Sequence, residues 1–373
     1  MEVRYFLSNL IFKIRYERSI QIGILISFLV AVNIGVWGGI LYALNASETQ
    51  AVEQVAYLPE IGERDDSGDG AVLERRLDGM MVSAQDANKP PIAVMIENAA
   101  FDQVRPQYGL SKALVIYEVI VESGITRFMA VFAGDDIPQI GPVRSARPTY
   151  LEFASEYDAF YAHAGGSPEA LSSIEGLGIK DMNALTGDSR FFWRDTSRFA
   201  PHNLYTSWQL LTTALKEKGF NEKTPDFIAW NFKNGKPAEE RTEEQRQIKL
   251  FFSNPSYDVE WNYDKENNYY TRINGGELQH DALNQETLSA KNVIVQIVPP
   301  LIPAGEKGRV NFNVTGEGLA YIFRDGEIIE GTWKKKDRLS RTIYFDNNKQ
   351  EVELIRGNTW VEILPEDRTF EYK

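Results

Sequence analysis

A charge-free apolar run from Ile20 to Leu44 constrains this chain more than any other feature. About 25 helical residues reach roughly 37 Å, which is enough to cross a hydrocarbon core of about 30 Å. Basic residues precede the run, and the first charge after it is Glu48. The positive-inside rule therefore predicts a cytoplasmic N-terminus over 1–19, a single-pass transmembrane helix over 20–44 and extracytoplasmic domains beyond it. A cleaved signal peptide is the alternative, but its apolar region is normally only about 7–15 residues long.

The amino-acid composition excludes some kinds of site and some classes of partner. The chain has no cysteine, which excludes disulfides, thiolate metal sites, a cysteine nucleophile and a lipid anchor on cysteine. A net charge of −13 argues against nucleic acid as a partner, because neutralising phosphates needs a basic surface. With 43% hydrophobic and 12% aromatic residues, the chain can build a hydrophobic core that needs no disulfide or metal cross-links.

The part after the apolar run divides by pattern into three segments. An acidic stretch poor in aromatic residues predicts a flexible tether over 45–89. Short apolar strands alternate with amphipathic helices over 90–224, which predicts an α/β domain. The expected strands are Ile92–Ile96, Ala113–Val121, Arg127–Ala133 and Asp158–Ala162.

Helix starts and stops in 90–224 follow local capping rules. Pro148 suits the first position of a helix. A second helix is expected over Pro168–Leu177, with Ser167 as N-cap and Gly178 past its end. A third is expected after Thr206, where Gln209 would complete a capping box.

The segment 225–373 has a different pattern, in which strands are separated by Asn-Gly, Asp-Gly and Gly-x-Gly turns. The expected strands are Lys249–Phe252, Val259–Tyr263, Tyr269–Ile273, Asn292–Val298, Val310–Val314, Leu319–Arg324, Arg341–Phe345, Glu351–Ile355 and Thr359–Leu364. The predicted fold class is an α/β N-terminal soluble domain plus a mainly antiparallel β C-terminal domain, with an N-terminal transmembrane helix.

Two loops carry the first candidate site. Arg144 and Arg147 precede a helix start, and guanidinium groups beside free helix N–H groups favour an anion. The structural alternative is that one arginine pairs with an acid such as Glu118 or Asp195. His163 ends a strand and is followed by Gly165, Gly166 and Ser167. If the strands are adjacent, both loops lie at one carboxyl edge of the sheet, where ligands commonly bind.

A third loop holds Arg194, Asp195, Arg198, His202 and Asn203. His202 with Asp195 could act as a general base and its orienting acid, or the two could brace the loop. Glu118 interrupts an apolar strand, so it should be paired or lie in a crevice. The predicted catalytic residues are His163, His202, Asp195 and Glu118.

The predicted ligand-binding residues are Arg144, Arg147, Gly165, Gly166, Ser167, Arg194, Arg198 and Asn203. No metal or cofactor is predicted, because the three histidines lack the spacing of a metal motif.

Several motifs together resemble the YerB-like lipoprotein family, catalogued as domain of unknown function 3048. They are Ile92–Asn98, Arg105–Gln107, Gly124–Phe128, Gly141–Pro148, His163–Ser167, Pro201–Tyr205, Ala290–Val295 and Gly331–Lys335. The resemblance implies a bacterial cell-envelope protein outside the membrane and carries no enzymatic activity with it. This chain departs from the family in having no lipidated cysteine, and in having Ala99 and Ala100 where many members have a histidine.

The sequence thus predicts a membrane-anchored envelope protein whose α/β domain binds an anionic cell-wall or glycan component. Arg144, Arg147 and His163 would form the floor of the site, and the loop around His202 a second wall. Hydrolase or transferase activity stays open. The alternative is a non-catalytic scaffold or regulator of cell-wall synthesis enzymes.

Overall fold

The computed structural model describes residues 71–373 apart from 102, 135, 222–223 and 243–245. These residues belong to one compact unit, Asp69–Lys373. Among the described helices, none combines the length and the apolar character needed to cross a bilayer. The transmembrane segment expected over 20–44, and the tether as far as residue 70, lie outside the described residues.

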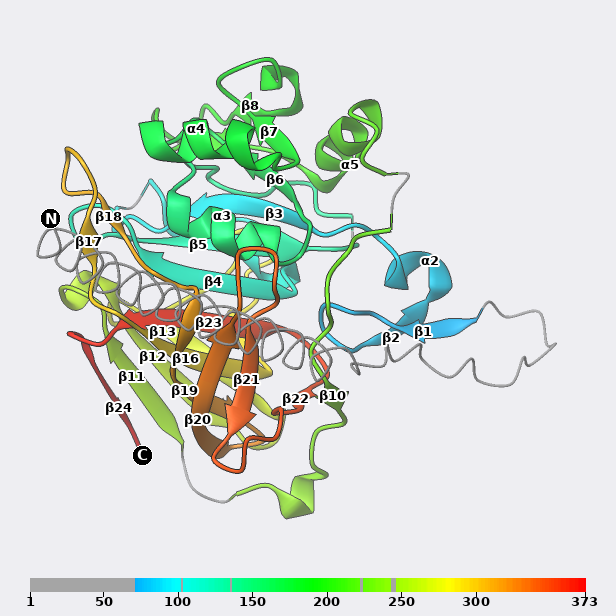
Figure 1. Ribbon diagram of the computed structural model, residues 1–373, viewed down its shortest axis with the longest axis vertical. Helices are drawn as coiled ribbons and strands as arrows, with labels where there is room; N and C mark the ends of the chain where they lie inside the picture. Colours follow the sequence, from blue (N-terminus) through cyan, green and yellow to red (C-terminus); the bar gives the residue numbers. More distant parts are fainter. Residues whose placement is uncertain (1–70, 102, 135, 222–223, 243–245) are drawn as a thin grey trace, which may run out of the picture. The chain divides into compact units, whose positions relative to one another are not determined.

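A ten-stranded mixed sheet forms the centre of this unit (Figure 1). In spatial order its strands are β21 (Ile343–Asp346), β20 (Glu327–Lys335), β19 (Gly316–Arg324), β16 (Asn292–Val298), β23 (Thr359–Pro365), β4 (Val115–Ile120), β5 (Thr126–Phe132), β3 (Ile92–Glu97), β6 (Phe160–His163) and β7 (Asp181–Asn183). Every residue of β3, β4, β5 and β6 is buried, which explains their near-continuous apolar sequences.

The predicted fold class is wrong. The described unit is mostly β, and its central sheet takes strands from both halves of the chain. In Figure 1 the cyan β4 lies beside the red β23, which pairs in parallel with β4 on one side and with β16 on the other. The β strands that the sequence assigned to a separate domain therefore complete the sheet of the first.

A second, antiparallel sheet packs on one face of the first. Its strands are β14 (Glu277–Leu278), β13 (Tyr269–Asn274), β12 (Asp258–Asp264), β11 (Gln247–Phe251) and β24 (Thr369–Tyr372), with β15 (Ser289–Ala290) paired to β13. The ring of Trp261 on β12 meets that of Trp360 on β23 edge to face, with centroids 5.2 Å apart. One hydrophobic core joins the two sheets.

Three helices of eight to ten residues accompany the sheets. They are α3 (Pro148–Ser155), α4 (Pro168–Leu177) and α5 (Trp208–Glu217). The cap predictions for α4 are confirmed, since Ser167 accepts from Ala170 N and Gly178 is left-handed. The α5 cap is Ser207 rather than Thr206, whose hydroxyl is buried and donates to Phe191 O.

The remaining elements are short. They are β1 (Val72–Glu74), β2 (Met81–Ser83), α2 (Ala84–Ala87), β8 (Trp193–Arg194), β9 (Leu204–Tyr205), β10 (Phe232–Lys233), β17 (Ile302–Pro303), β18 (Val310–Asn311), β22 (Leu354–Ile355) and 3-10 turns at Leu110–Lys112, Ser189–Phe191, Ala238–Glu240 and Pro255–Tyr257.

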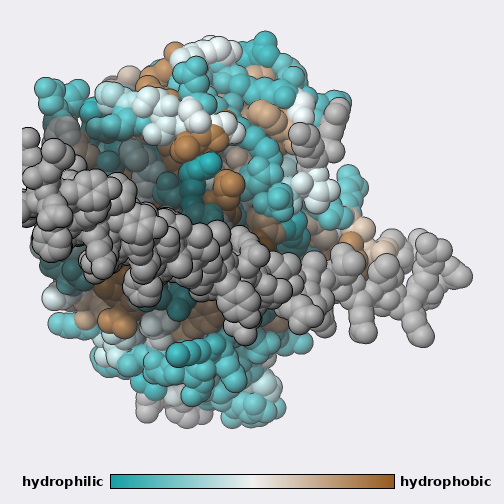
Figure 2. Space-filling view, in the orientation of Figure 1, coloured by the Kyte–Doolittle hydropathy of each residue, from teal (hydrophilic) through white to brown (hydrophobic). Residues whose placement is uncertain are grey.

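Alternation along β4 shows how the layers are ordered. Tyr117 stacks on Phe153 of α3 at 4.3 Å, whereas Glu118 pairs with Arg272 of β13. Successive strand residues point to opposite faces, so α3 covers one face of the sheet and β13 the other. Figure 2 shows mostly hydrophilic residues on one face of the described part, with small brown patches between them.

Candidate functional site

The candidate loops meet where β3 and β6 end. These strands are parallel, so Glu97 and His163 lie at the same edge of the sheet. The arginine loop runs alongside: Arg144 N donates to Met95 O, and Ala164 N donates to Arg144 O, both at 2.9 Å. The arginine loop and the glycine loop are therefore neighbours in the backbone.

Arg144 and His202 converge on one carboxylate. Arg144 Nη2 donates to Glu97 Oε1 at 2.5 Å, and His202 Nδ1 lies 2.9 Å from the same oxygen. Arg144 Nη2 and His202 Nδ1 are 3.2 Å apart. The orienting acid of His202 is thus Glu97, whereas the sequence suggested Asp195.

The geometry fixes which nitrogen of His202 carries a proton. Without a proton, Nδ1 would face the carboxylate with a lone pair at 2.9 Å, which is repulsive. Nδ1 is therefore protonated and donates to Glu97. The other ring nitrogen, Nε2, makes no hydrogen bond to a described residue, so it can exchange a proton with a ligand.

The three groups differ in exposure. The side chain of Glu97 is 5% exposed, while those of Arg144 and His202 are 21% and 23% exposed. Two polar atoms of the cluster, Glu97 Oε2 and Arg144 Nε, are buried without a hydrogen-bond partner among the described residues. A carboxylate thus lies beneath two partly exposed nitrogen-bearing groups whose bonding capacity is not filled, which is unusual for a purely structural ion pair.

Glu118 lies one layer deeper. It is fully buried, pairs with Arg272 and accepts from Asn98 Nδ2 at 3.1 Å. Arg272 Nη1 also binds Glu362 at 2.7 Å, so two carboxyl groups share one guanidinium. Burial raises the pKa of Glu362 to about 8, and the charge of Glu118 adds to that effect. Glu118 therefore belongs to the packing between the two sheets and does not reach the surface site.

Arg147 is held away from Arg144. It forms a two-pronged pair with Glu122 (Nε to Oε2 3.0 Å, Nη2 to Oε1 2.8 Å), and Arg127 binds the same carboxylate at 2.7 Å. Burial acts to raise the pKa of Glu122, but the charges of Arg127 and Arg147 outweigh it and hold that pKa below its ordinary value. With its carboxylate already bound, Arg147 serves as a brace.

Both ring nitrogens of His163 already have hydrogen-bond partners. Its Nδ1 lies 2.7 Å from Gly165 O and its Nε2 lies 2.6 Å from Asp181 Oδ1. Both ring nitrogens therefore already have a partner within the protein. The side chain is fully buried, and neither nitrogen is available to a ligand.

The glycine loop packs against leucines. A Cβ at Gly165 would come within 2.8 Å of Leu185, and one at Gly166 within 3.1 Å of Leu171. Both glycines therefore make room for side chains. Ser167 is fully buried and caps α4, as the sequence predicted.

The third loop is braced from within and against residues 103–106. Arg194 Nη1 donates to Asn203 Oδ1 at 2.7 Å, and Asn203 Nδ2 donates to Asp195 O at 2.8 Å. Arg198 donates to the carbonyls of Val104 and Pro106, at 3.0 and 2.8 Å. Hydrogen bonds from Ser197 lower the pKa of Asp195. These contacts hold the backbone that carries His202.

The sequence reasoning missed Glu97 as a site residue. One signal was present, because Glu97 ends a strand whose other residues are all apolar. Glu118 interrupts the apolar strand β4 in a similar way, and it was noticed for that reason.

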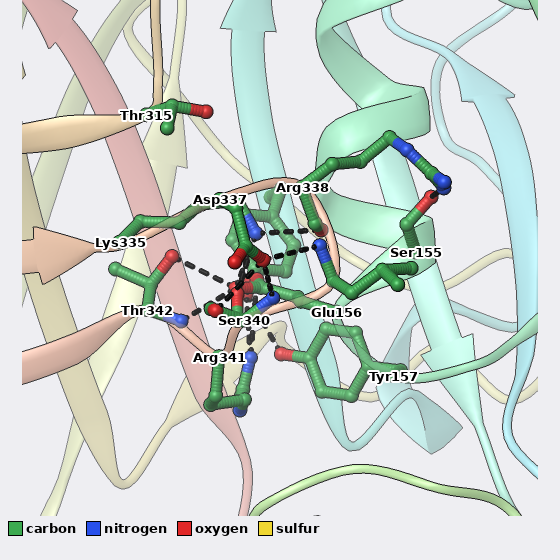
Figure 3. Close-up of polar contacts among 12 residues, drawn as sticks. Ser155, Glu156, Tyr157, Thr315, Lys335, Asp337, Arg338, Ser340, Arg341 and Thr342 are labelled. Carbon is green, nitrogen blue, oxygen red and sulfur yellow. Dashed lines mark hydrogen bonds and ion pairs between the residues drawn. The ribbon is translucent and has the colours of Figure 1, made fainter. Parts of the chain in front are cut away.

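The sequence reasoning also missed a fully buried cluster around Glu156 (Figure 3). There Lys335, Arg341 and Thr342 point at the Glu156 carboxylate, with Thr342 N at 2.6 Å. Both Glu156 oxygens are occupied, so this cluster joins α3 to the β20–β21 loop and offers nothing to a ligand.

Comparisons with known proteins agree on one relationship. Models of the N-terminal and C-terminal domains of "Protein of unknown function (DUF3048)" match residues 77–221 and 248–361. A relative from Bacillus subtilis (strain 168) named "Putative lipoprotein YerB" is 30% identical over 296 residues, covering 79% of this chain and 87% of the relative. The crystal structure of the YerB protein from Bacillus subtilis matches with a TM-score of 0.71 at 27% identity, covering 80% of this chain and 99% of that chain.

Proposed function

Since this chain belongs to the YerB-like family of DUF3048 proteins, we propose that it is an extracytoplasmic cell-envelope protein that binds an anionic cell-wall or glycan component at Arg144 and His202. The family assignment made from the sequence motifs is confirmed. The single observation that carries the ligand proposal is the convergence of these two partly exposed side chains on the buried Glu97 carboxylate.

The proposed location outside the membrane rests on the name of the Bacillus subtilis relative. The Bacillus subtilis relative is named "Putative lipoprotein YerB", and lipoproteins are held at a membrane by a lipid. This chain contains no cysteine to carry such a lipid. We infer that the described unit lies on the outer side of the membrane.

The charge of the site supports an anion. Glu97 and Arg144 cancel, so a protonated His202 leaves one net positive charge. Arg144 Nη1 and His202 Nε2 then offer two donors that no described residue occupies. In its neutral form, His202 Nε2 accepts a proton instead, which is the requirement for hydrolase or transferase chemistry with His202 as the base.

Two conservative variants of the full chain test the proposal. Arg144→Lys keeps a cation for Glu97 and removes the free Nη1 donor, while His202→Gln keeps a donor for Glu97 and removes the titratable nitrogen. Titration calorimetry with tetraglutamate should show each variant binding at least about tenfold more weakly, with little change in melting temperature. Arg190→Lys is the control, because Arg190 is exposed and pairs with Glu217 at the surface. Absence of binding of both tetraglutamate and an acidic oligosaccharide by the unmodified chain would reject the proposal.

A second candidate, a non-catalytic scaffold or regulator of wall-synthesis enzymes, is favoured by the braces. Arg147, Arg194 and Arg198 all bind acceptors of the protein itself. If Arg144 and His202 act in the same way, both variants will lower the melting temperature by several degrees and no anion will bind.

A further inference from the structure

Two exposed phenylalanines accompany the Arg144–His202 site. Phe101 is 56% exposed and Phe199 is 74% exposed. Single exposed hydrophobic residues are ordinary, but these two belong to the two loops that surround one polar site. Their exposure means that neither ring contributes much to the core.

The Phe101 ring contacts His202, and the backbone of Phe199 is bonded to the same residue. The Phe101 ring meets the His202 ring edge to face, with centroids 5.7 Å apart. His202 N donates to Phe199 O at 2.9 Å, and Phe199 N donates to Gln103 Oε1 at 3.1 Å. The loop that carries Phe199 and His202 is thus joined to the loop that carries Phe101 in two ways. One is the hydrogen bond from Phe199 to Gln103, and the other is the ring contact between His202 and Phe101.

Both loops are fixed before any ligand arrives. Arg198 donates to Gln103 O and Val104 O, and Arg105 donates to the side chain of Asn98 at 3.0 Å and to its carbonyl at 2.9 Å. Aromatic rings in a preset backbone lose little conformational entropy on binding, so they provide contact area at low cost.

We propose that this site recognises an acidic saccharide, a pyranose that carries a carboxylate or phosphate, with Phe101 and Phe199 as residues that determine specificity. The inference rests on the proposed function, because it takes the anion site as given and names what surrounds the anion. The acidic group would lie between Arg144 Nη1 and His202 Nε2, and the C–H face of the sugar against the Phe rings.

The chemistry favours a saccharide over a simple acid. A free carboxylate or an acidic side chain uses only the two donors and gains nothing from neighbouring aromatic rings. A pyranose presents an apolar face within one ring width of its acidic substituent, which suits a spacing of 5.7 Å between the Phe101 and His202 rings. Carboxylated and phosphorylated sugars share this chemistry, and the experiment separates them.

Calorimetric titration of the full chain with four probes tests the inference. The probes are tetra-glucuronate linked as in cellulose, neutral cellotetraose, tetraglutamate and an oligomer of glucose 6-phosphate residues. We expect an acidic saccharide to bind at least about tenfold more tightly than both cellotetraose and tetraglutamate. Phe101→Ala and Phe199→Ala should each weaken that binding by about twofold to tenfold, and weaken tetraglutamate binding by a smaller factor.

Leu339→Ala is the matched control, because Leu339 is 64% exposed and lies in the β20–β21 loop. Equal binding of tetraglutamate and both acidic saccharides, with no effect of either Phe variant, would overturn the saccharide inference and leave the anion site standing. A loss of tetraglutamate binding in the Phe variants that equals or exceeds the loss of saccharide binding would overturn it in favour of an acidic peptide. No binding by any acidic probe would reject the proposed function itself. Preference for the carboxylated or the phosphorylated oligomer identifies which acidic group the site takes.

Discussion

Nδ1 of His202 lies 2.9 Å from Oε1 of Glu97, a carboxylate that closes an otherwise apolar strand 105 residues earlier in the chain. The same oxygen accepts from Arg144 Nη2, so a single buried atom orients both groups of the proposed site.

Glu97→Gln should therefore destabilise the fold. The amide cannot neutralise Arg144, and one cation is left without a counter-charge at a site that is mostly buried. We expect the free energy of unfolding to fall by about 1–3 kcal/mol, measured by urea denaturation followed by circular dichroism.

The matched control is Glu217→Gln, which breaks the surface pair with Arg190. It should change the free energy of unfolding by about 0.5 kcal/mol or less. Equal effects of the two substitutions would show that Glu97 is as dispensable as a surface acid.

Glu362 should make stability depend on pH. Its pKa is raised to about 8 by burial and by Glu118, against about 4.3 in an unfolded chain. Between these values the folded state holds a proton that the unfolded state has released. Stability from this group is therefore fully present below about pH 4.3 and declines as the pH rises towards 8.

Glu362→Gln removes that titration while it keeps an oxygen for Trp261 Nε1 and Arg272 Nη1. Relative to the unmodified chain, the variant should gain stability as the pH is raised from about 5 to about 8. The measurement is a series of urea denaturations across this range. A constant difference between the two proteins would contradict a proton on Glu362.

Glu156→Gln tests the cluster in Figure 3. Lys335 and Arg341 lie 3.4 and 3.1 Å from the Glu156 carboxylate, and all three side chains are buried. Removing the negative charge leaves two buried cations, so we expect a loss of about 3–5 kcal/mol in the free energy of unfolding.

Glu152→Gln is the control for that loss, because Glu152 lies on the same helix and is partly exposed. It should cost much less than Glu156→Gln in the same denaturation assay. A similar cost for both would assign the effect to helix α3 and not to the buried charges.

Local rules explain which parts of the fold could be predicted. The ends of α4 depend on Ser167 and Gly178, which act within one helical turn, and these were predicted correctly. The α5 cap was misplaced by one residue because Thr206 and Ser207 are both good caps, and a tertiary contact from Thr206 to Phe191 O decides between them.

Distant contacts explain what the sequence did not reveal. Glu118 was expected to need a partner, but that partner, Arg272, lies 154 residues away on another sheet. The expected edge of the sheet brings the Arg144 loop and the His163 loop together, but it does not reveal the separate acids that Arg147 and His163 bind. Pairing between strands from opposite ends of the chain has no local signal, which is why the fold class was wrong.

The place of β23 has a consequence for biosynthesis. β23 is the last strand of the ten-stranded sheet in chain order, yet it fills the gap between β4 and β16. Until β23 leaves the ribosome, each of those strands has one side without its native partner, and open edges of this kind recruit other chains. The nascent chain should therefore depend on holding chaperones until residues 359–365 have left the ribosome.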